Sequence, residues 1–148
     1  MPKQQHAAPA EPLSPCNCLA IRQAARHVSQ FYDRQLAASG LRASQFSILR
    51  KLARLGPLSI NELAGMMVME RTAMGRALRP LERDGLIAVG AGRDRRTRAL
   101  RLTPAGEARL AAAEARWREA QQQFEATVGG EASAALRETL ARVIAVVP

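Results

Sequence analysis

Residues 58–103 of this chain read LSINELAGMMVMERTAMGRALRPLERDGLIAVGAGRDRRTRALRLT, and this stretch predicts the fold. Ser59 and Glu62 form a capping box, in which each side chain satisfies a backbone N–H at the start of a helix. After a short break, a second helix is expected over residues 70–84, and Gly85 stands where helices commonly end. The apolar residues of that helix fall on one face, and its arginines lie largely off it. Two helices joined by a tight turn, the second basic at its exposed N-terminal end, describe a helix-turn-helix.

A short basic hairpin follows the second helix. Strands are expected over residues 86–89 and 99–102, and the glycine-hinged tip between them, residues 90–98, carries four arginines. Thr103 and Pro104 then supply an N-cap and a proline at the first helical position, so a new helix begins. A helix-turn-helix with a basic hairpin is a winged helix, and an arginine-rich wing suits the narrow, electronegative minor groove of DNA.

Composition and charge agree with a DNA-binding role. The chain has 148 residues, enough for one domain that buries roughly two-thirds of its unfolded surface. The formal net charge is +9, and 20 of the 22 basic residues are arginine. Nine of them lie within residues 70–101, against four acidic residues, so the charge is concentrated and favours an acidic polymer as partner. No apolar run approaches a membrane span or a signal-peptide core, and a cytoplasmic location is expected.

The segments on either side of the winged helix predict long helices. We expect a flexible arm over residues 1–14, a dimerisation helix over 15–40, a winged helix-turn-helix domain over 41–103 and C-terminal dimerisation helices over 104–148. Within the domain, a helix over residues 43–54 should turn Phe46, Leu49, Leu52 and Leu55 inward, and Leu58 should pair beside the wing. The C-terminal segment should break at Gly129–Gly130. The predicted fold class is therefore mainly α with a small β-wing.

The terminal helices carry more apolar surface than one small winged helix can cover. The simplest solution is a homodimer in which helices from both ends of the chain interleave with those of a second copy. A homodimer also suits the target, because two recognition helices one helical turn apart can read a palindrome.

These features resemble the MarR-type transcriptional regulators. The residues that carry the resemblance are Leu81–Ile87 (LERDGLI), the wing pattern Asp94-x-Arg96, Leu102–Gly106 (LTPAG) and, upstream, Gln45–Leu49 (QFSIL). The resemblance covers about residues 18–146 and implies a triangular, two-fold homodimer. It indicates a repressor that leaves its operator when a small-molecule effector binds or when a thiol is oxidised. Pro80 departs from the pattern, because it removes the N–H that would bond the Arg76 carbonyl and should kink the recognition helix.

The expected DNA contacts lie on the recognition helix and the wing. They are Arg71, Thr72, Ala73, Arg76 and Arg79 on the helix, and Arg93, Asp94, Arg95, Arg96 and Arg98 on the wing. Arg96 resembles the family's minor-groove arginine, which Asp94 would brace through a charge-assisted pair. The other wing arginines are expected to contact phosphates. The alternatives are an ordinary solvated helix face and a wing-stem salt bridge that lies away from DNA.

Cys16 and Cys18 have three interpretations: no chemical role, redox sensing, or metal binding. They stand at the predicted start of the first helix, where N–H groups and the helix dipole favour a thiolate. A branch of the resembled family senses organic peroxides through a cysteine near this place. The single tyrosine, Tyr32, is too far along the same helix to touch Cys16. A metal site made by the two cysteines and His27 lacks a fourth ligand, so we expect no metal.

The resemblance also implies an effector pocket between the dimer helices and the winged helix. Its candidate residues are His27, Gln30, Phe31, Phe46 and Trp117. The aromatic residues among them are equally well explained as core, and His27 as a surface histidine. Arg22 or Arg26 could favour a small anionic or phenolic effector.

Two other function classes compete with a sequence-specific regulator. The first is a non-specific architectural DNA-binding protein, which would share the charge but not discriminate among sequences. The second is an enzyme. The sequence offers no paired nucleophile and base, no phosphate-binding glycine loop and no metal constellation, so we expect neither catalysis nor a cofactor.

Overall fold

The structure is a computed structural model that describes residue 12 and residues 14–148. The expected flexible arm, residues 1–14, falls almost wholly outside the described residues. The helices and strands in chain order are α1 (Asn17–Leu36), the 3-10 turn η1 (Ala37–Ser39), α2 (Ala43–Leu55), α3 (Ile60–Met66), α4 (Arg71–Arg83), β1 (Ile87–Ala91), β2 (Arg98–Leu102), α5 (Pro104–Val128) and α6 (Gly130–Val146). The predicted fold class, mainly α with a two-stranded wing, is confirmed.

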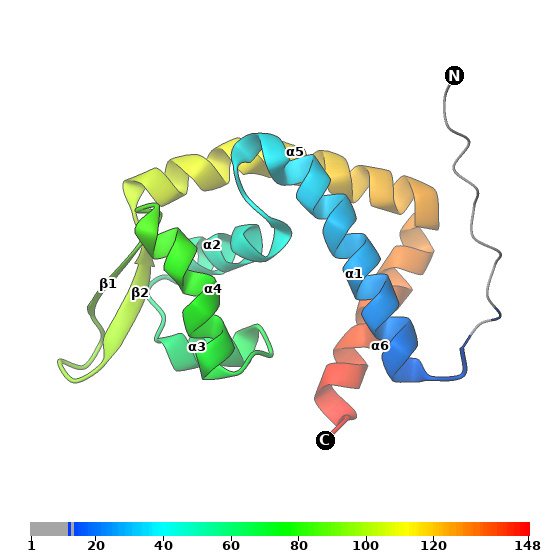
Figure 1. Cartoon of the computed structure of the whole chain (residues 1–148), viewed down its shortest axis with the longest axis horizontal. Coiled ribbons are helices and arrows are strands. Elements are labelled where there is room, and N and C mark those ends of the chain that lie inside the picture. The colour runs from blue at the N-terminus through cyan, green and yellow to red at the C-terminus, as the bar shows by residue number, and fades with distance from the viewer. Residues whose placement is uncertain (1–11, 13) are drawn as a thin grey trace.

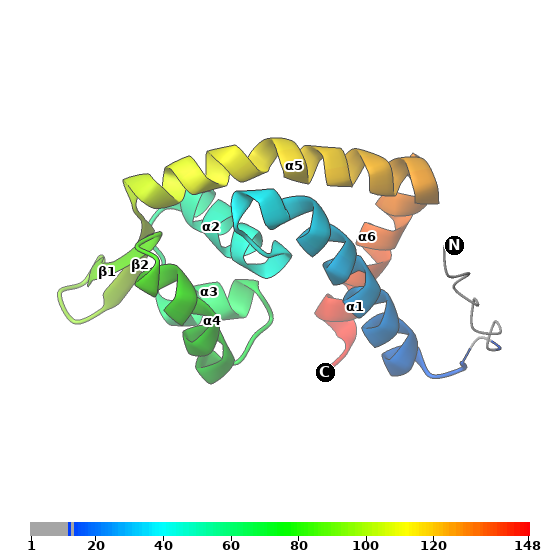
Figure 2. The ribbon, with the colours of Figure 1, turned by 45° about the horizontal axis from the view of Figure 1, so that its top comes forward.

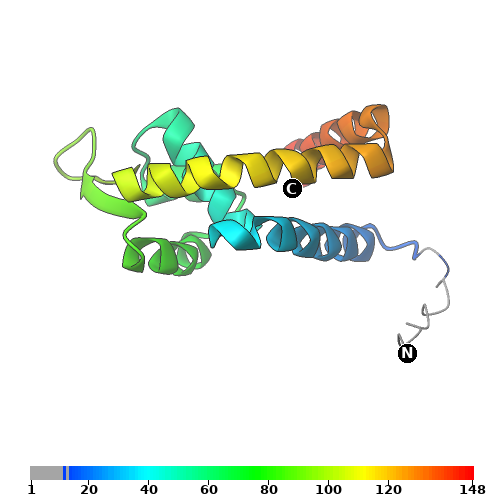
Figure 3. The same ribbon diagram turned by 90° about the horizontal axis from the view of Figure 1, so that it is seen from above.

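The molecule has two parts. Helices α2, α3 and α4 and the hairpin β1–β2 form a winged-helix lobe, and α5 starts at the base of the wing and runs over it (Figure 1). Beyond the lobe, α6 folds back from the end of α5, with α1 beside them (Figure 2). Seen from above, α1 and the α5–α6 pair extend away from the lobe in the same direction (Figure 3). No helix in the part of the chain that the structure describes is both long and apolar enough to cross a membrane.

The predicted helix signals are present as hydrogen bonds. The Ser59 backbone N–H donates to Glu62 Oε2 at 2.7 Å, and the Glu62 N–H donates to Ser59 Oγ at 3.1 Å. The Ser59 backbone N–H, and secondarily the Ser59 hydroxyl, hold the pKa of the Glu62 carboxyl below its ordinary value. Gly85 follows α4 with a φ of 71°, the left-handed conformation that glycine adopts most easily after a helix. The local sequence therefore fixes where α3 begins and where α4 ends.

The wing is longer than the sequence suggested. Strand β1 extends to Ala91 and β2 starts at Arg98, although residues 90, 91 and 98 were expected in the hairpin tip. Two bonds stabilise this extension: the Gly92 N–H donates to the Thr97 carbonyl at 2.7 Å, and the Arg101 guanidinium donates to the Ala91 carbonyl at 3.0 Å. The expected pairing of Leu58 beside the wing is confirmed by its bridge to Leu100.

One apolar core holds the lobe together. It is built from α1, α2, α3, α4, both strands and α5, and its most buried large side chains are Leu36, Ile48, Leu49, Leu63, Met74 and Leu81. Leu55 was expected inside but is 50% exposed, because it is the last residue of α2. A break was expected at Gly129–Gly130. In the structure only Gly129, with a φ of 100°, lies between α5 and α6, because α6 already begins at Gly130.

The junction between the wing and α5 is tightly bonded. Thr103 Oγ1 accepts the Gly106 N–H at 3.0 Å and donates to the Gly85 carbonyl at 2.6 Å. The Thr103 N–H donates to the Leu86 carbonyl at 3.1 Å. Gly106 is buried here, and a Cβ atom at this position would collide with the Leu86 carbonyl oxygen. The start of α5 is thus fixed against the turn that follows α4.

Candidate nucleic-acid interface

Helix α4 has one buried face and one exposed, basic face. Met74, Leu78 and Leu81 are buried in the lobe. Arg71, Thr72, Arg76 and Arg79 are exposed, and Ala73 is half-buried at the margin between the two faces. The residues that were expected to contact DNA from this helix therefore lie on its solvent side.

The N-terminal end of α4 and the tip of the wing both point away from α5 (Figure 1). Arg93, Arg95, Arg96 and Arg98 are all exposed on the wing. Among the described residues, the only ion pair involving α4 or the wing joins Arg83 to Asp84, at 3.4 Å. The remaining arginines have no carboxylate partner within the described chain. Apart from Arg101, which donates to the Ala91 carbonyl, their guanidinium groups are available to phosphates or base edges.

The expected pairing of Asp94 with the Arg96 side chain is wrong. Asp94 Oδ1 instead accepts the backbone N–H of Arg96 at 3.3 Å, and the Asp94 carbonyl accepts the N–H of Thr97 at 3.0 Å. The reason is local, because an aspartate at the first position of a turn bonds the main chain two residues on. Asp94 therefore shapes the turn, and the Arg96 guanidinium forms no ion pair with any residue that the structure describes.

Pro80 lies inside α4, which is a single helix from Arg71 to Arg83. The carbonyl of Pro80 accepts the N–H of Asp84 at 3.0 Å, so the helical bonding resumes after it. Proline has no backbone N–H to donate. The arginines at the N-terminal end of α4 lie before Pro80, in the part of the helix that precedes this lost hydrogen bond.

Both cysteines are exposed, and they form no disulfide with each other. Cys16 is the N-cap of α1, and its sulfur accepts the Leu19 N–H at 3.5 Å. The only tyrosine, Tyr32, bonds Gln121 instead of approaching either thiol. In residues 12 and 14–148, no group of three or more His, Cys, Asp and Glu side chains could hold a metal ion.

The five residues expected to line an effector pocket are not brought together. His27 and Phe31 line a cleft of about 310 Å³ between α1 and the end of α5, and Gln30 is exposed outside it. Phe46 is buried and stacks on the half-buried Trp117, with ring centroids 5.8 Å apart. The aromatic pair thus packs α2 against α5, whereas His27 and Phe31 line a separate cleft between α1 and the end of α5.

A basic cleft that was not anticipated lies next to this aromatic pair. It has a volume of about 630 Å³ and is lined by Ser47, Arg50, Lys51, Arg54 and Leu55 of α2, Trp117 and Gln121 of α5, and Arg137 of α6. The spacing of Ser47, Arg50, Lys51 and Arg54 along one face of a helix was a visible signal. The approach of Arg137, more than eighty residues later, had no local signal.

An apolar groove lies between α1, the C-terminal half of α5, and α6. Its volume is about 500 Å³, and its lining is aliphatic and aromatic except at Tyr32, Gln121, Ser133 and Arg137. The apolar side chains that stay exposed in and around it include Ile21 on α1 and Leu136, Leu140 and Ile144 on α6. Apolar area of this kind marks a surface that binds a partner.

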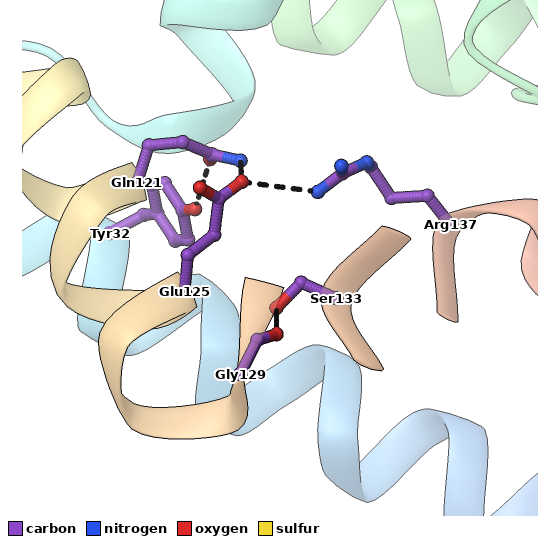
Figure 4. Close-up of polar contacts among 6 residues, drawn as sticks. All are labelled: Tyr32, Gln121, Glu125, Gly129, Ser133 and Arg137. Atoms are coloured by element: carbon purple, nitrogen blue, oxygen red, sulfur yellow. Dashed lines mark hydrogen bonds and ion pairs between the residues drawn. The ribbon is translucent and has the colours of Figure 1, made fainter. Parts of the chain in front are cut away.

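A chain of polar contacts joins the three helices at the end of the groove (Figure 4). The Tyr32 hydroxyl donates to Gln121 Oε1 at 2.6 Å, and Gln121 Nε2 donates to Glu125 Oε1 at 3.2 Å. The Arg137 guanidinium reaches the same Glu125 oxygen at 3.4 Å. Burial, and secondarily the negative charge of Glu125, raises the pKa of Tyr32 above its ordinary value, while Arg137 opposes the shift.

Known proteins share both the sequence of the lobe and the fold of the chain. The model of the MarR family matches residues 41–97. The uncharacterized HTH-type transcriptional regulator YwoH of Bacillus subtilis (strain 168) is 31% identical over 87 residues, which are 59% of this chain and 64% of YwoH. The chain thus spans less than two-thirds of that relative's length.

Two solved structures of the transcriptional regulator MosR from M. tuberculosis match over most of the molecule. The first is 36% identical with a TM-score of 0.77, and the match covers 89% of this chain and 95% of the MosR chain. The second, MosR in complex with DNA, is 38% identical with a TM-score of 0.73, and the match covers 87% of this chain and 98% of the MosR chain. The basic helix-turn-helix, the wing and these matches together show that the chain belongs to the MarR family of winged helix-turn-helix transcriptional regulators, which bind DNA.

Proposed function

We propose that this protein is a repressor that binds a palindromic operator as a homodimer and leaves it when an effector binds or a thiol is oxidised. The observation that carries the proposal is the shared orientation of the α4 N-terminus and the wing, both lined with arginines that form no ion pair with the described part of the chain. In this arrangement α4 would enter the major groove and the wing would reach the adjacent minor groove. MosR, at 38% identity, has been solved in complex with DNA.

The recognition helix and the wing have different tasks in this proposal. Arg71, Thr72, Ala73, Arg76 and Arg79 would face base edges and phosphates of the major groove. Arg96 would enter the minor groove, while Arg93, Arg95 and Arg98 would contact phosphates. Asp94 would act indirectly, by fixing the turn that presents Arg96.

Dimerisation would use the apolar groove and the faces of α1 and α6 beside it. Leu19 and Ile21 of α1 are 40% and 42% exposed, and Ile144 of α6 is 62% exposed. A second copy offers the same surface, which is what a two-fold interface requires. The dimer would also place two recognition helices at a fixed distance, as a palindrome demands.

A non-specific architectural DNA-binding protein is the alternative, and a competition titration separates the two. Labelled operator bound to the protein is challenged with unlabelled operator or with random duplex of equal length at fixed salt. A specific regulator should prefer its operator by roughly a thousandfold or more. Equal competition by both duplexes would favour the architectural role, because phosphate contacts alone carry no sequence information.

Arg96→Ala should weaken operator binding by about 1–3 kcal/mol and leave the dimer intact. Arg95→Ala is the matched control, since it removes the same charge from the same turn. Fluorescence anisotropy should give a larger loss for Arg96→Ala on the operator than on random duplex, and a similar small loss on both for Arg95→Ala. Unchanged operator affinity in Arg96→Ala would remove that residue from the interface.

Oxidation of the thiols is one of the two release routes. Cys16 and Cys18 are exposed at the start of α1, beside the proposed dimer surface. Anisotropy is therefore measured with reduced and with peroxide-treated protein, for the wild type and for a Cys16→Ser, Cys18→Ser variant. We expect peroxide to release DNA from the wild type only. If both proteins hold DNA equally under both conditions, the thiols are not sensors and release depends on a small ligand.

A further inference from the structure

Arg101 differs from the other arginines of the wing in what its side chain bonds. It stands near the base of β2, opposite Ala88 of β1. Its Nη2 donates to the Ala91 carbonyl at 3.0 Å, and in the part of the chain that the structure describes no other wing arginine donates a side-chain hydrogen bond. Cross-strand partners, and residues two apart along a strand, share a face of the hairpin, so Arg101 lies on the same face as Gly90. The side chain therefore bridges the two strands diagonally, towards the tip of the wing.

Gly90 provides the space for this bridge. A Cβ atom at position 90 would lie 3.5 Å from Arg101 Nε and 3.7 Å from both Cζ and Nη2. Because these three atoms of the planar guanidinium are almost equally distant, the group lies face-on over the glycine. One methyl group would fit here in ordinary van der Waals contact, whereas the two methyl groups of a valine would need the space that the guanidinium occupies. Gly90 and Arg101 therefore form a matched pair across the hairpin.

The Ala91 carbonyl belongs to the peptide group that closes the tip of the wing. This peptide group joins Ala91 to Gly92, and its N–H donates to the Thr97 carbonyl at 2.7 Å. A peptide group is planar, so the direction of its carbonyl fixes the direction of its N–H. A charge-assisted bond to the carbonyl also polarises the N–H and makes it a stronger donor. Arg101 thereby holds the closing bond of the tip from the base of the hairpin.

The closed tip fixes the backbone that carries Arg96. The Thr97 N–H and the Thr97 hydroxyl both donate to the Asp94 carbonyl at 3.0 Å, and the Arg96 N–H donates to Asp94 Oδ1 at 3.3 Å. The residues between Gly92 and Thr97 are thus held as one closed turn. A two-stranded hairpin is only marginally stable by itself, so a turn at its free end needs such bonds to keep one shape.

We propose that Arg101 is a positioning residue of the DNA-binding surface. Its bond to the Ala91 carbonyl holds the closed tip, and the tip presents Arg96 to the minor groove. The guanidinium is directed at the hairpin itself, so Arg101 supplies no phosphate contact although it adds to the positive charge of the wing. The role of Arg101 in DNA binding rests on the proposed entry of the wing into the minor groove, whereas its bond within the wing does not.

Amide hydrogen exchange of Gly92, followed by NMR on the full-length protein, tests the bond within the wing. Arg101→Met removes the donor, and Gly90→Val displaces the donor while every charge remains. Valine favours strands, so the hairpin should persist in that variant. We expect the Gly92 amide to exchange at least about tenfold faster in both variants and at the wild-type rate in Gly90→Ala, the matched control. An unchanged rate in Arg101→Met would disprove the proposal.

Operator binding at several salt concentrations separates positioning from a phosphate contact. Removing a residue that contacts a phosphate lowers the slope of log affinity against log salt by about 0.9. We expect fluorescence anisotropy to show operator affinity about tenfold weaker in Arg101→Met and in Gly90→Val, with a common slope. Arg93→Met, at the tip, should lower the slope by about 0.9. The two changes combined should weaken binding no more than either alone, because both break one bond.

The contrary results differ in what they overturn. A slope that falls in Arg101→Met but not in Gly90→Val would make Arg101 a phosphate contact. Faster Gly92 exchange with unchanged operator affinity in both variants would leave the bond in place and disprove its role in positioning. If Arg96→Ala also binds the operator like the wild type, the wing does not enter the minor groove. The proposed function then fails at the wing, and the exchange measurement still decides whether Arg101 holds the tip.

Discussion

Replacing Leu136 and Leu140 together by aspartate should produce a monomer and abolish tight operator binding. Both side chains line the apolar groove and are 43% and 37% exposed in the single chain. In the proposed dimer they would be covered by a second copy, where two carboxylates without partners cost several kcal/mol each. A monomer offers one recognition helix to the operator, so the loss of the second site should lower affinity by about a hundredfold or more.

The control for this variant places the same two charges elsewhere on the same helix. Ala135 and Thr139 are exposed, four residues apart as the leucines are, and neither lines the groove. Ala135→Asp with Thr139→Asp should leave the dimer and its operator affinity nearly unchanged. Sedimentation velocity gives the oligomeric state, and anisotropy gives the affinity. A monomeric leucine variant with full operator affinity would contradict the palindrome proposal, and a leucine variant that remains dimeric would remove the groove from the interface.

Gly106→Ala should destabilise the fold by about 1–3 kcal/mol, towards the upper end of the range for overpacked sites. The new methyl group would press on the Leu86 carbonyl oxygen and lie 2.9 Å from Leu102 Cδ1. Leu102 can change rotamer, but the Leu86 carbonyl is fixed by the N–H of Thr103. The start of α5 must therefore move away from the turn after α4, against the higher helix propensity of alanine.

Gly130→Ala is the matched control for this prediction. Gly130 is the first residue of α6, and a Cβ atom there would meet nothing within 4 Å. Alanine at that position should therefore change the free energy of unfolding little or raise it slightly. Urea unfolding of the three proteins measures the difference. Equal stability of Gly106→Ala and the wild type would mean that the contact between α5 and the Leu86 turn is loose.

The local signals in the sequence were enough to predict the lobe. The capping box at Ser59, the glycine at position 85 and the Thr103-Pro104 pair each act within a few residues, so the chain around them shows their effect directly. The hairpin tip was placed less well, because its length depends on cross-strand bonds such as that from Arg101 to the Ala91 carbonyl. Asp94 was misassigned for a related reason, since an aspartate before a turn can bond either a neighbouring side chain or the main chain.

The sequence could not predict the sites that distant segments of the chain form together. The sequence predicts Phe46 and Trp117 in one pocket, and the structure does pack them together, but as a stacked pair between α2 and α5. His27 and Phe31 face another cleft, because α1 contacts the far half of α5. The basic cleft needs Arg137 beside α2, and that proximity follows only from the path of α5 and α6. The assignment of individual DNA-contacting residues stays a prediction.

The unbroken course of α5 has a mechanical consequence. Its 25 residues, at about 1.5 Å of rise each, form a rod about 37 Å long that is bonded to the wing at one end and continues into α6 at the other. A tilt of about 5° at the α6 end would displace the wing by about 3 Å, close to the rise of one base pair. Such a lever would convert a small change of angle where α5 meets α6 into a shift of about one base-pair step at the DNA.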